Sequence, residues 1–129
     1  MKYEKFILPR EVTIGERTFA VSKIPAFPTA QQVYSAVGKS VSDNGPLGFS
    51  MLPSATIKTI LEYTALHSDG SWIPLDTEAI ANEVFRDSFG DMQSLVLEMI
   101  KENFGFFVSG RLLDELEGLE PKAETESGS

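Results

Sequence analysis

Two prolines, Pro25 and Pro28, divide the chain into a part with strand character and a part with helical character. Proline lacks the N–H that a strand donates to its neighbour, so it ends a region of paired strands. Before Pro25 the residues alternate, with Phe19 and Val21 on one strand face and the residues between them on the other. We therefore expect the strands in residues 3–24.

The expected strands are joined by a short loop at Gly15-Glu16. Glycine at the first central position of a two-residue loop is typical of a type II′ hairpin turn. The stretch therefore predicts an N-terminal β-hairpin.

After Pro28, apolar residues recur at the three- and four-residue spacing of helices. Thr29 and Gln32 have the form of a capping box, and Gly105 ends the last helical stretch. Residues 67–71 form a turn, and the next four residues cross over to the third helix. The expected helix starts are Thr29, Ser54, Asp76 or Thr77, and Gly90-Asp91. The loop at 45–53 carries apolar side chains that we expect to be exposed: Leu47, Phe49, Met51 and Leu52.

These patterns predict a small, mostly helical α+β domain, with the N-terminal β-hairpin followed by four to five packed helices. We expect residues 1–117 to form a single globular domain, with the hairpin region at 3–24 and the helical region at 29–116. Residues 118–129 are Glu, Pro, Lys, Ala, Thr, Ser, Gly and Leu, a composition that buries too little apolar surface to order itself. We expect them to be a disordered, acidic C-terminal tail.

The net charge of -8 is unevenly distributed along the 129 residues. Residues 114–129 hold 6 acidic side chains against Lys122 alone, while the preceding part holds 13 acidic against 10 basic side chains. Nucleic-acid binding depends on basic patches, and the chain has none. We therefore expect no nucleic-acid partner, and the body also lacks the dense acidic stripe of a DNA mimic.

The N-terminus contains a run of three apolar residues, 6–8, before Pro9, which is shorter than the core of a signal peptide. No run of 18 apolar residues predicts a membrane span. The absence of cysteine excludes disulfides and thiolate metal sites. We therefore expect an intracellular protein with no membrane partner.

No set of residues predicts catalysis, a metal site or a cofactor. His67 is the single histidine, and its neighbours Ser68 and Asp69 cannot converge with it as a triad on one turn; we expect it to be a solvated residue at a helix end. Residues 45–48 lack the Lys and Ser/Thr of a phosphate loop, and the glycines at 105 and 110 do not have dinucleotide-binding spacing. The helical glutamates are expected on solvated faces: Glu62, Glu83, Glu98 and Glu102.

An apolar, Phe-rich segment at residues 104–113 remains as the candidate working surface, since exposed apolar surface and aromatic side chains are typical of interfaces. Phe104 is expected mainly in the core. Phe106 and Phe107 are adjacent and cannot both face one way on a regular element, so at least one is expected at the surface. The candidate residues for binding a client protein are Phe104, Phe106, Phe107, Val108, Leu112 and Leu113. The residues alone therefore indicate protein binding, not an enzyme.

Three segments together resemble the tail assembly chaperones of long-tailed bacteriophages. The first is Phe-Ile-Leu-Pro at 6–9 with Thr-Ile-Gly-Glu-Arg-Thr-Phe at 13–19, and the second is Ile-Pro-Ala-Phe-Pro-Thr-Ala at 24–30. The third is Asn-Phe-Gly-Phe-Phe-Val-Ser-Gly-Arg-Leu at 103–112. The resemblance covers most of residues 5–116.

The resemblance implies a protein that coats the apolar tape measure protein in the host cell cytoplasm and keeps it soluble. It also implies recruitment of the major tail tube protein, with release before the virion is complete, and self-association is compatible with coating. The alternative is a virion structural protein, such as a head–tail connector or tail terminator, which would form a closed ring. An enzyme or regulator would require a buried polar pair in a deep pocket, which the sequence does not predict.

Overall fold

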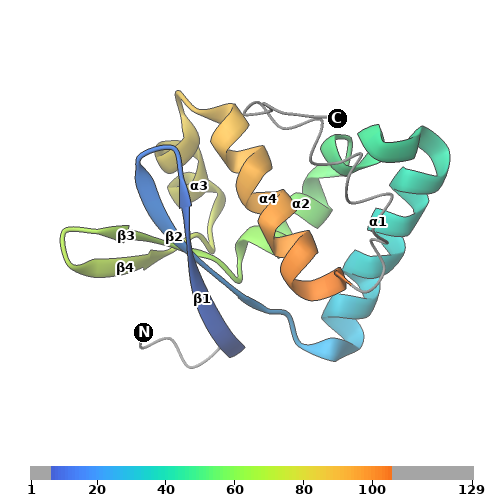
Figure 1. Ribbon diagram of the computed structural model, residues 1–129, viewed down its shortest axis with the longest axis horizontal. Coiled ribbons are helices and arrows are strands. Elements are labelled where there is room, and N and C mark those ends of the chain that lie inside the picture. The colour runs from blue at the N-terminus through green and yellow to red at the C-terminus, as the bar shows by residue number, and fades with distance from the viewer. Residues whose placement is uncertain (1–6, 106–129) are drawn as a thin grey trace, which may run out of the picture.

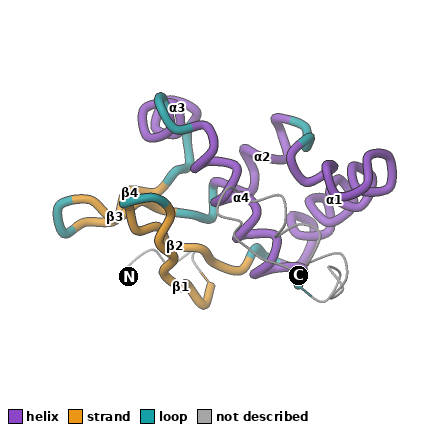
Figure 2. Tube along the Cα trace, turned by 45° about the horizontal axis from the view of Figure 1, so that its top comes forward, coloured by secondary structure: helices purple, strands orange, loops and turns teal. Residues whose placement is uncertain are grey.

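The computed structural model of the protein describes residues 7–105, which form one four-stranded sheet and four α-helices. The strands are β1 (Ile7–Ile14), β2 (Arg17–Lys23), β3 (Ala65–Ser68) and β4 (Ser71–Pro74). The helices are α1 (Gln31–Asn44), α2 (Ser54–Leu61), α3 (Glu78–Phe85) and α4 (Phe89–Phe104), with short turns η1 (Ala26–Ala30) and η2 (Gly45–Ser50). The predicted α+β class is confirmed. Figures 1 and 2 show the strands at one end of the molecule, α1 at the other, and α4 between them.

The predicted N-terminal hairpin is formed by β1 and β2, which pair antiparallel around the two-residue loop Gly15-Glu16. Gly15 has φ of 63°, while Glu16 is not among the residues with positive φ, as a type II′ turn requires. β1 continues through Pro9, with an irregular register between Ile7 and Arg10. The predicted hairpin residues 3–6 lie outside the described part of the chain.

A second hairpin, formed by β3 and β4, was not predicted. The sequence indicated a turn at 67–71 followed by a crossing segment, but the structure has paired strands on both sides of Asp69-Gly70. Asp69 and Gly70 have φ of 52° and 80°, the two positive values of a type I′ hairpin turn. The sheet order is therefore β1-β2-β3-β4, and this hairpin projects away from the helices (Figure 1).

β2 is an inner strand of the sheet and is buried on both faces. Phe19 and Val21 lie fully buried in the main core, which also contains Leu95 and Met99 of α4. On the opposite face, Ala20 lies beside Ala65 of β3 in a second small cluster against which Trp72 packs. Burial of a large apolar side chain such as Phe19 contributes about 2–3 kcal/mol.

Arg17, at the start of β2, ties the hairpin to the junction between α3 and α4. Its guanidinium donates to the Val84 carbonyl at 2.8 Å and to Ser88 Oγ at 2.9 Å, and it lies 3.3 Å from Asp91 Oδ2. The same group lies 5.4 Å from the ring centroid of Phe19. These contacts fix one end of β2 against the start of α4.

The predicted helix starts agree with the structure only in part. Thr77 caps α3 as predicted, accepting a hydrogen bond from the Ile80 N–H at 3.2 Å. The capping box predicted at Thr29 is absent: Thr29 lies inside η1, where the Ala30 N–H donates to the Pro25 carbonyl, and α1 begins at Gln31 without a side-chain cap. Two other starts are displaced by one or two residues: Pro53 occupies the cap position of α2, and Ser88 that of α4.

Gly48 allows η2 to lie directly against α1. A Cβ atom added at Gly48 would lie 2.2 Å from the Ser40 carbonyl oxygen, which is closer than any such contact can be. At Gly38, inside α1, an added Cβ meets nothing within 4 Å. A side chain is therefore excluded at Gly48 by the neighbouring backbone, whereas there is room for one at Gly38.

We predict that Gly48→Ala lowers the free energy of unfolding by about 3 kcal/mol, because the backbones of η2 and α1 must separate. Gly38→Ala is the matched control and should raise it by about 1 kcal/mol through helix propensity. Chemical denaturation of both variants measures the difference. Equal stability of the two variants would contradict the close packing of η2 on α1.

Candidate functional site

The end of α4 leads into the predicted client-binding segment, and Asn103 fixes this end to β2. The Asn103 side chain donates to the Ser22 carbonyl at 3.0 Å and accepts from the Ile24 N–H at 2.8 Å. It also donates to the Met99 carbonyl, one turn earlier in α4, at 3.0 Å. The amide thus takes the place of a strand partner for the last residues of β2.

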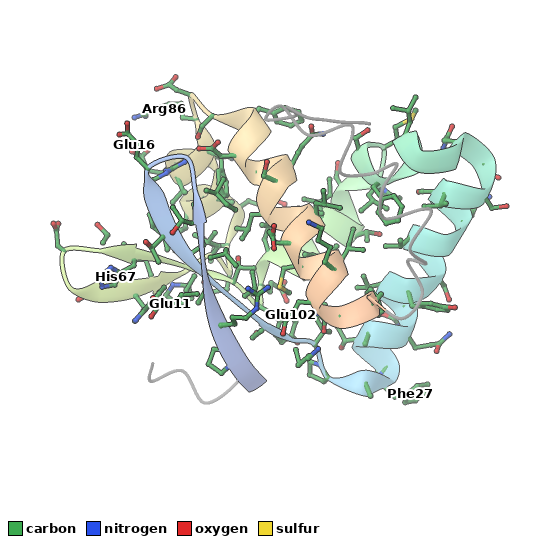
Figure 3. The ribbon with its side chains drawn as sticks, in the orientation of Figure 1. Glu11, Glu16, Phe27, His67, Arg86 and Glu102 are labelled. Carbon is green, nitrogen blue, oxygen red and sulfur yellow. The ribbon has the colours of Figure 1, made fainter. Side chains whose placement is uncertain are left out.

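Charged side chains strengthen the same junction. Arg10 Nε donates to Glu102 Oε1 at 2.9 Å, and its guanidinium lies 3.8 Å from Glu98. Lys23 donates to the Glu102 backbone carbonyl, and its ammonium group lies 3.7 Å from the Glu102 carboxylate. Figure 3 shows Glu102 at this contact between α4 and the strands. The predicted solvation of Glu98 and Glu102 is therefore only partial, at 30% and 18% side-chain exposure, because both face the cations of the sheet.

A hollow of about 420 Å³ lies beside this junction, between the end of α4 and the start of α1. One wall is aromatic: the rings of Tyr34 and Phe104 lie 5.7 Å apart at an angle of 54°. The lining residues are Lys23, Ile24, Ala26, Ala30, Gln31, Tyr34, Asn103 and Phe104. The hollow is thus lined by both apolar and polar residues.

Of the predicted client-binding residues, Phe104 is described, and it lies in the core with 5% of its surface exposed. This agrees with the expectation that it belongs mainly to the core. The other predicted residues, Phe106, Phe107, Val108, Leu112 and Leu113, lie outside the described part of the chain. The acidic tail at 118–129 lies outside it as well.

The largest exposed apolar side chains of the described region lie elsewhere. Phe27 is 81% exposed and projects beside the start of α1 (Figure 3). Phe89 is 63% exposed, Met51 57% and Leu47 54%. The exposure predicted for the loop at 45–53 is thus correct for Leu47 and Met51. It is wrong for Phe49 and Leu52, which are buried.

Met51 and Phe89 flank a contact between η2 and α4. Gln93, one turn after Phe89, donates to the Ser50 carbonyl at 3.4 Å, and Ser50 directly precedes Met51. The sequence pattern did not single out Phe89, which is the first residue of α4. Phe27 entered the sequence interpretation only as part of the segment between the prolines, although the Pro-Ala-Phe-Pro context was a signal for an irregular, exposed position.

His67 lies in β3 and not at a helix end, so that prediction is wrong in detail. It is exposed as expected, and its ring packs against Trp72 at 4.8 Å across the hairpin. Within residues 7–105, no group of three or more His, Asp or Glu side chains could hold a metal ion. In the same region, no helix combines the length and apolar character needed to cross a lipid bilayer.

No family model matches the chain, and no curated protein or solved structure matches it either.

We predict that Asn103→Ala lowers the free energy of unfolding by about 2–3 kcal/mol, because the Ile24 N–H and two carbonyl groups lose their partner. Asn82→Ala, on the exposed face of α3, is the matched control and should change stability by less than about 0.5 kcal/mol. Thermal and denaturant unfolding of both variants test this. Wild-type stability of Asn103→Ala would show that the Asn103 amide does not hold α4 to β2.

Proposed function

We propose that this protein is a tail assembly chaperone of a long-tailed bacteriophage, which binds the tape measure protein in the host cytoplasm and keeps it soluble. In this role it also recruits the major tail tube protein and leaves before the virion is complete. The proposal rests on the resemblance of segments 6–19, 24–30 and 103–112 to that family. It includes no catalytic step and no cofactor.

The observation that best supports the proposal is the exposure of large apolar side chains on a strongly acidic chain. Phe27, Met51 and Phe89 are each more than half exposed, while the net charge is -8. Apolar contacts favour binding to an apolar client, and net negative charge keeps the complex in solution. A protein that coats an apolar chain needs both properties.

Within the candidate segment 104–113, the geometry of the α4 end supports a division between a structural start and a client-binding part. Asn103 and Phe104 are held by hydrogen bonds and by the core, so the following residues start from a fixed position. A rigid base lowers the entropy lost on binding. Within the resembling segment 103–112, the first two residues are thus structural, and the contact with the client is assigned to the residues after them.

We predict that co-expression with the neighbouring tape measure gene increases the soluble fraction of the tape measure protein and yields a complex in pull-downs. Phe106→Ser with Phe107→Ser should reduce the recovered complex about tenfold or more, because aromatic side chains dominate interface energies. The fold should remain, as measured by circular dichroism. Unfolding of this variant would instead assign both rings to the core.

A second pair of variants tests whether the described surface also contacts the client. Phe27→Ser removes the most exposed aromatic side chain of residues 7–105, whereas Lys39→Ser removes an equally exposed cation of α1. A client contact at Phe27 lowers complex recovery for the first variant and not for the second. If the client stays insoluble and unbound with the wild-type protein, the chaperone proposal is wrong. Co-purification of the protein with mature particles would favour the virion structural alternative.

A further inference from the structure

β1 is an edge strand whose outer side is accessible. Within the described residues it pairs with β2 alone, and it is the first strand in the sheet order (Figure 1). Glu11 and Thr13 are exposed, and Figure 3 shows Glu11 on the side of β1 away from α4. An exposed edge carries backbone groups that can pair with a strand of another chain.

The register of the hairpin determines which backbone groups point outward. Ile14 and Arg17 flank a two-residue loop and therefore form a hydrogen-bonded pair. Hydrogen-bonded and non-hydrogen-bonded pairs alternate along an antiparallel ladder, so Val12 is also hydrogen-bonded to β2. Glu11 and Thr13 belong to the non-hydrogen-bonded pairs. The N–H and C=O groups of Glu11 and Thr13 consequently point away from the sheet.

The part of the outer edge that can form hydrogen bonds is short, because the ladder cannot be extended at either end of β1. Pro9 has no N–H to donate, and the register is irregular between Ile7 and Arg10. At the other end the strand turns at Gly15. Glu11 and Thr13 are thus the two residues that can extend the ladder with both N–H and C=O.

We propose that two copies of this protein pair antiparallel through β1, with the two-fold axis at Val12, and so join their sheets into one. In this register Glu11 of each copy faces Thr13 of the other, and both are the outward-pointing residues that a hydrogen-bonded pair needs. Each of the two symmetric pairs exchanges two N–H···O=C bonds. On the core-side face, Val12 lies opposite Val12 of the second copy.

The two neighbouring registers of a second copy are less favourable than the register centred on Val12. A shift that centres the axis on Glu11 places two carboxylates opposite each other and uses Pro9, which lacks a donor. A shift that centres it on Thr13 brings Glu11 opposite the turn at Gly15. The strand is therefore self-complementary about Val12.

The contact is weak in the isolated protein, because four backbone hydrogen bonds and the facing Val12 side chains only slightly exceed the freedom lost on association. We therefore expect a dissociation constant on the order of 1 mM. Copies bound side by side on one long client experience millimolar effective concentrations, at which such a contact forms. The pairing itself is a property of the protein alone and does not depend on the proposed function.

The experiment is sedimentation equilibrium and amide hydrogen exchange of the full chain over a concentration series up to several millimolar. We expect a monomer–dimer equilibrium, with exchange at Glu11 and Thr13 slowing as the concentration rises. The Val12 amide, already bonded to β2, is the internal control and should not change. A protein that stays monomeric throughout, with constant exchange at these two amides, overturns the proposal.

Charge substitutions at the exposed Thr13 side chain test the register. Thr13→Glu places a carboxylate opposite Glu11 twice in the symmetric dimer and should weaken dimerisation about tenfold. Thr13→Lys places a cation there and should not weaken it, and Glu11→Lys combined with Thr13→Glu should restore it. Dimerisation that is equally strong in Thr13→Glu would show that a different surface is used. Unfolding curves of each variant verify that the fold is kept.

Discussion

The packing of α4 against β2 is the interaction on which the rest of the structure depends. β2 contributes Phe19 and Val21 to the core, and α4 contributes Leu95 and Met99. Polar groups fix the two elements at both ends of this contact. Arg17 bonds to the residues around the start of α4, and 86 residues later in the chain Asn103 bonds to the residues at the end of β2. Apolar burial supplies most of the stabilisation, while the directional bonds set the register of helix on strand.

This arrangement explains how the end of α4 becomes a defined base for the residues that follow. Phe104 is buried, Asn103 is bonded to β2, and Glu102 pairs with Arg10 and Lys23. The outer edge of β1, whose Arg10 belongs to the same junction, has a different character because it offers backbone groups and not side chains.

Apolar surface is distributed over several parts of the described region. Phe27 lies beside the start of α1, and Met51 and Phe89 lie at the junction of η2 with α4. Several separated contacts would suit the long client of the proposed function better than a single deep pocket, because each contact is weak and the sum is reversible. The acidic charge of the chain offsets the tendency of such surface to aggregate.

The sequence by itself determined the class of the fold and its first hairpin. Gly15 specifies its turn through positive φ, Thr77 caps α3 by a local hydrogen bond, and the helical spacing of apolar residues places α1 to α4 within a few residues. These features depend on neighbours in the chain, so a sequence pattern reveals them. The β3–β4 hairpin also had a local signal in Asp69-Gly70, but its four-residue strands are too short to show alternation.

Only the tertiary structure decided which residues serve the candidate site. The Asn103 amide bonds to Ser22 and Ile24, which lie 81 and 79 residues earlier in the chain. Glu98 and Glu102 have the spacing of a solvated helix face and become partners of Arg10 because β1 crosses that face. Exposure is equally non-local: Phe49 and Met51 are two residues apart, yet the first is buried and the second exposed. Such contacts arise from the packing of distant segments, which no local pattern encodes.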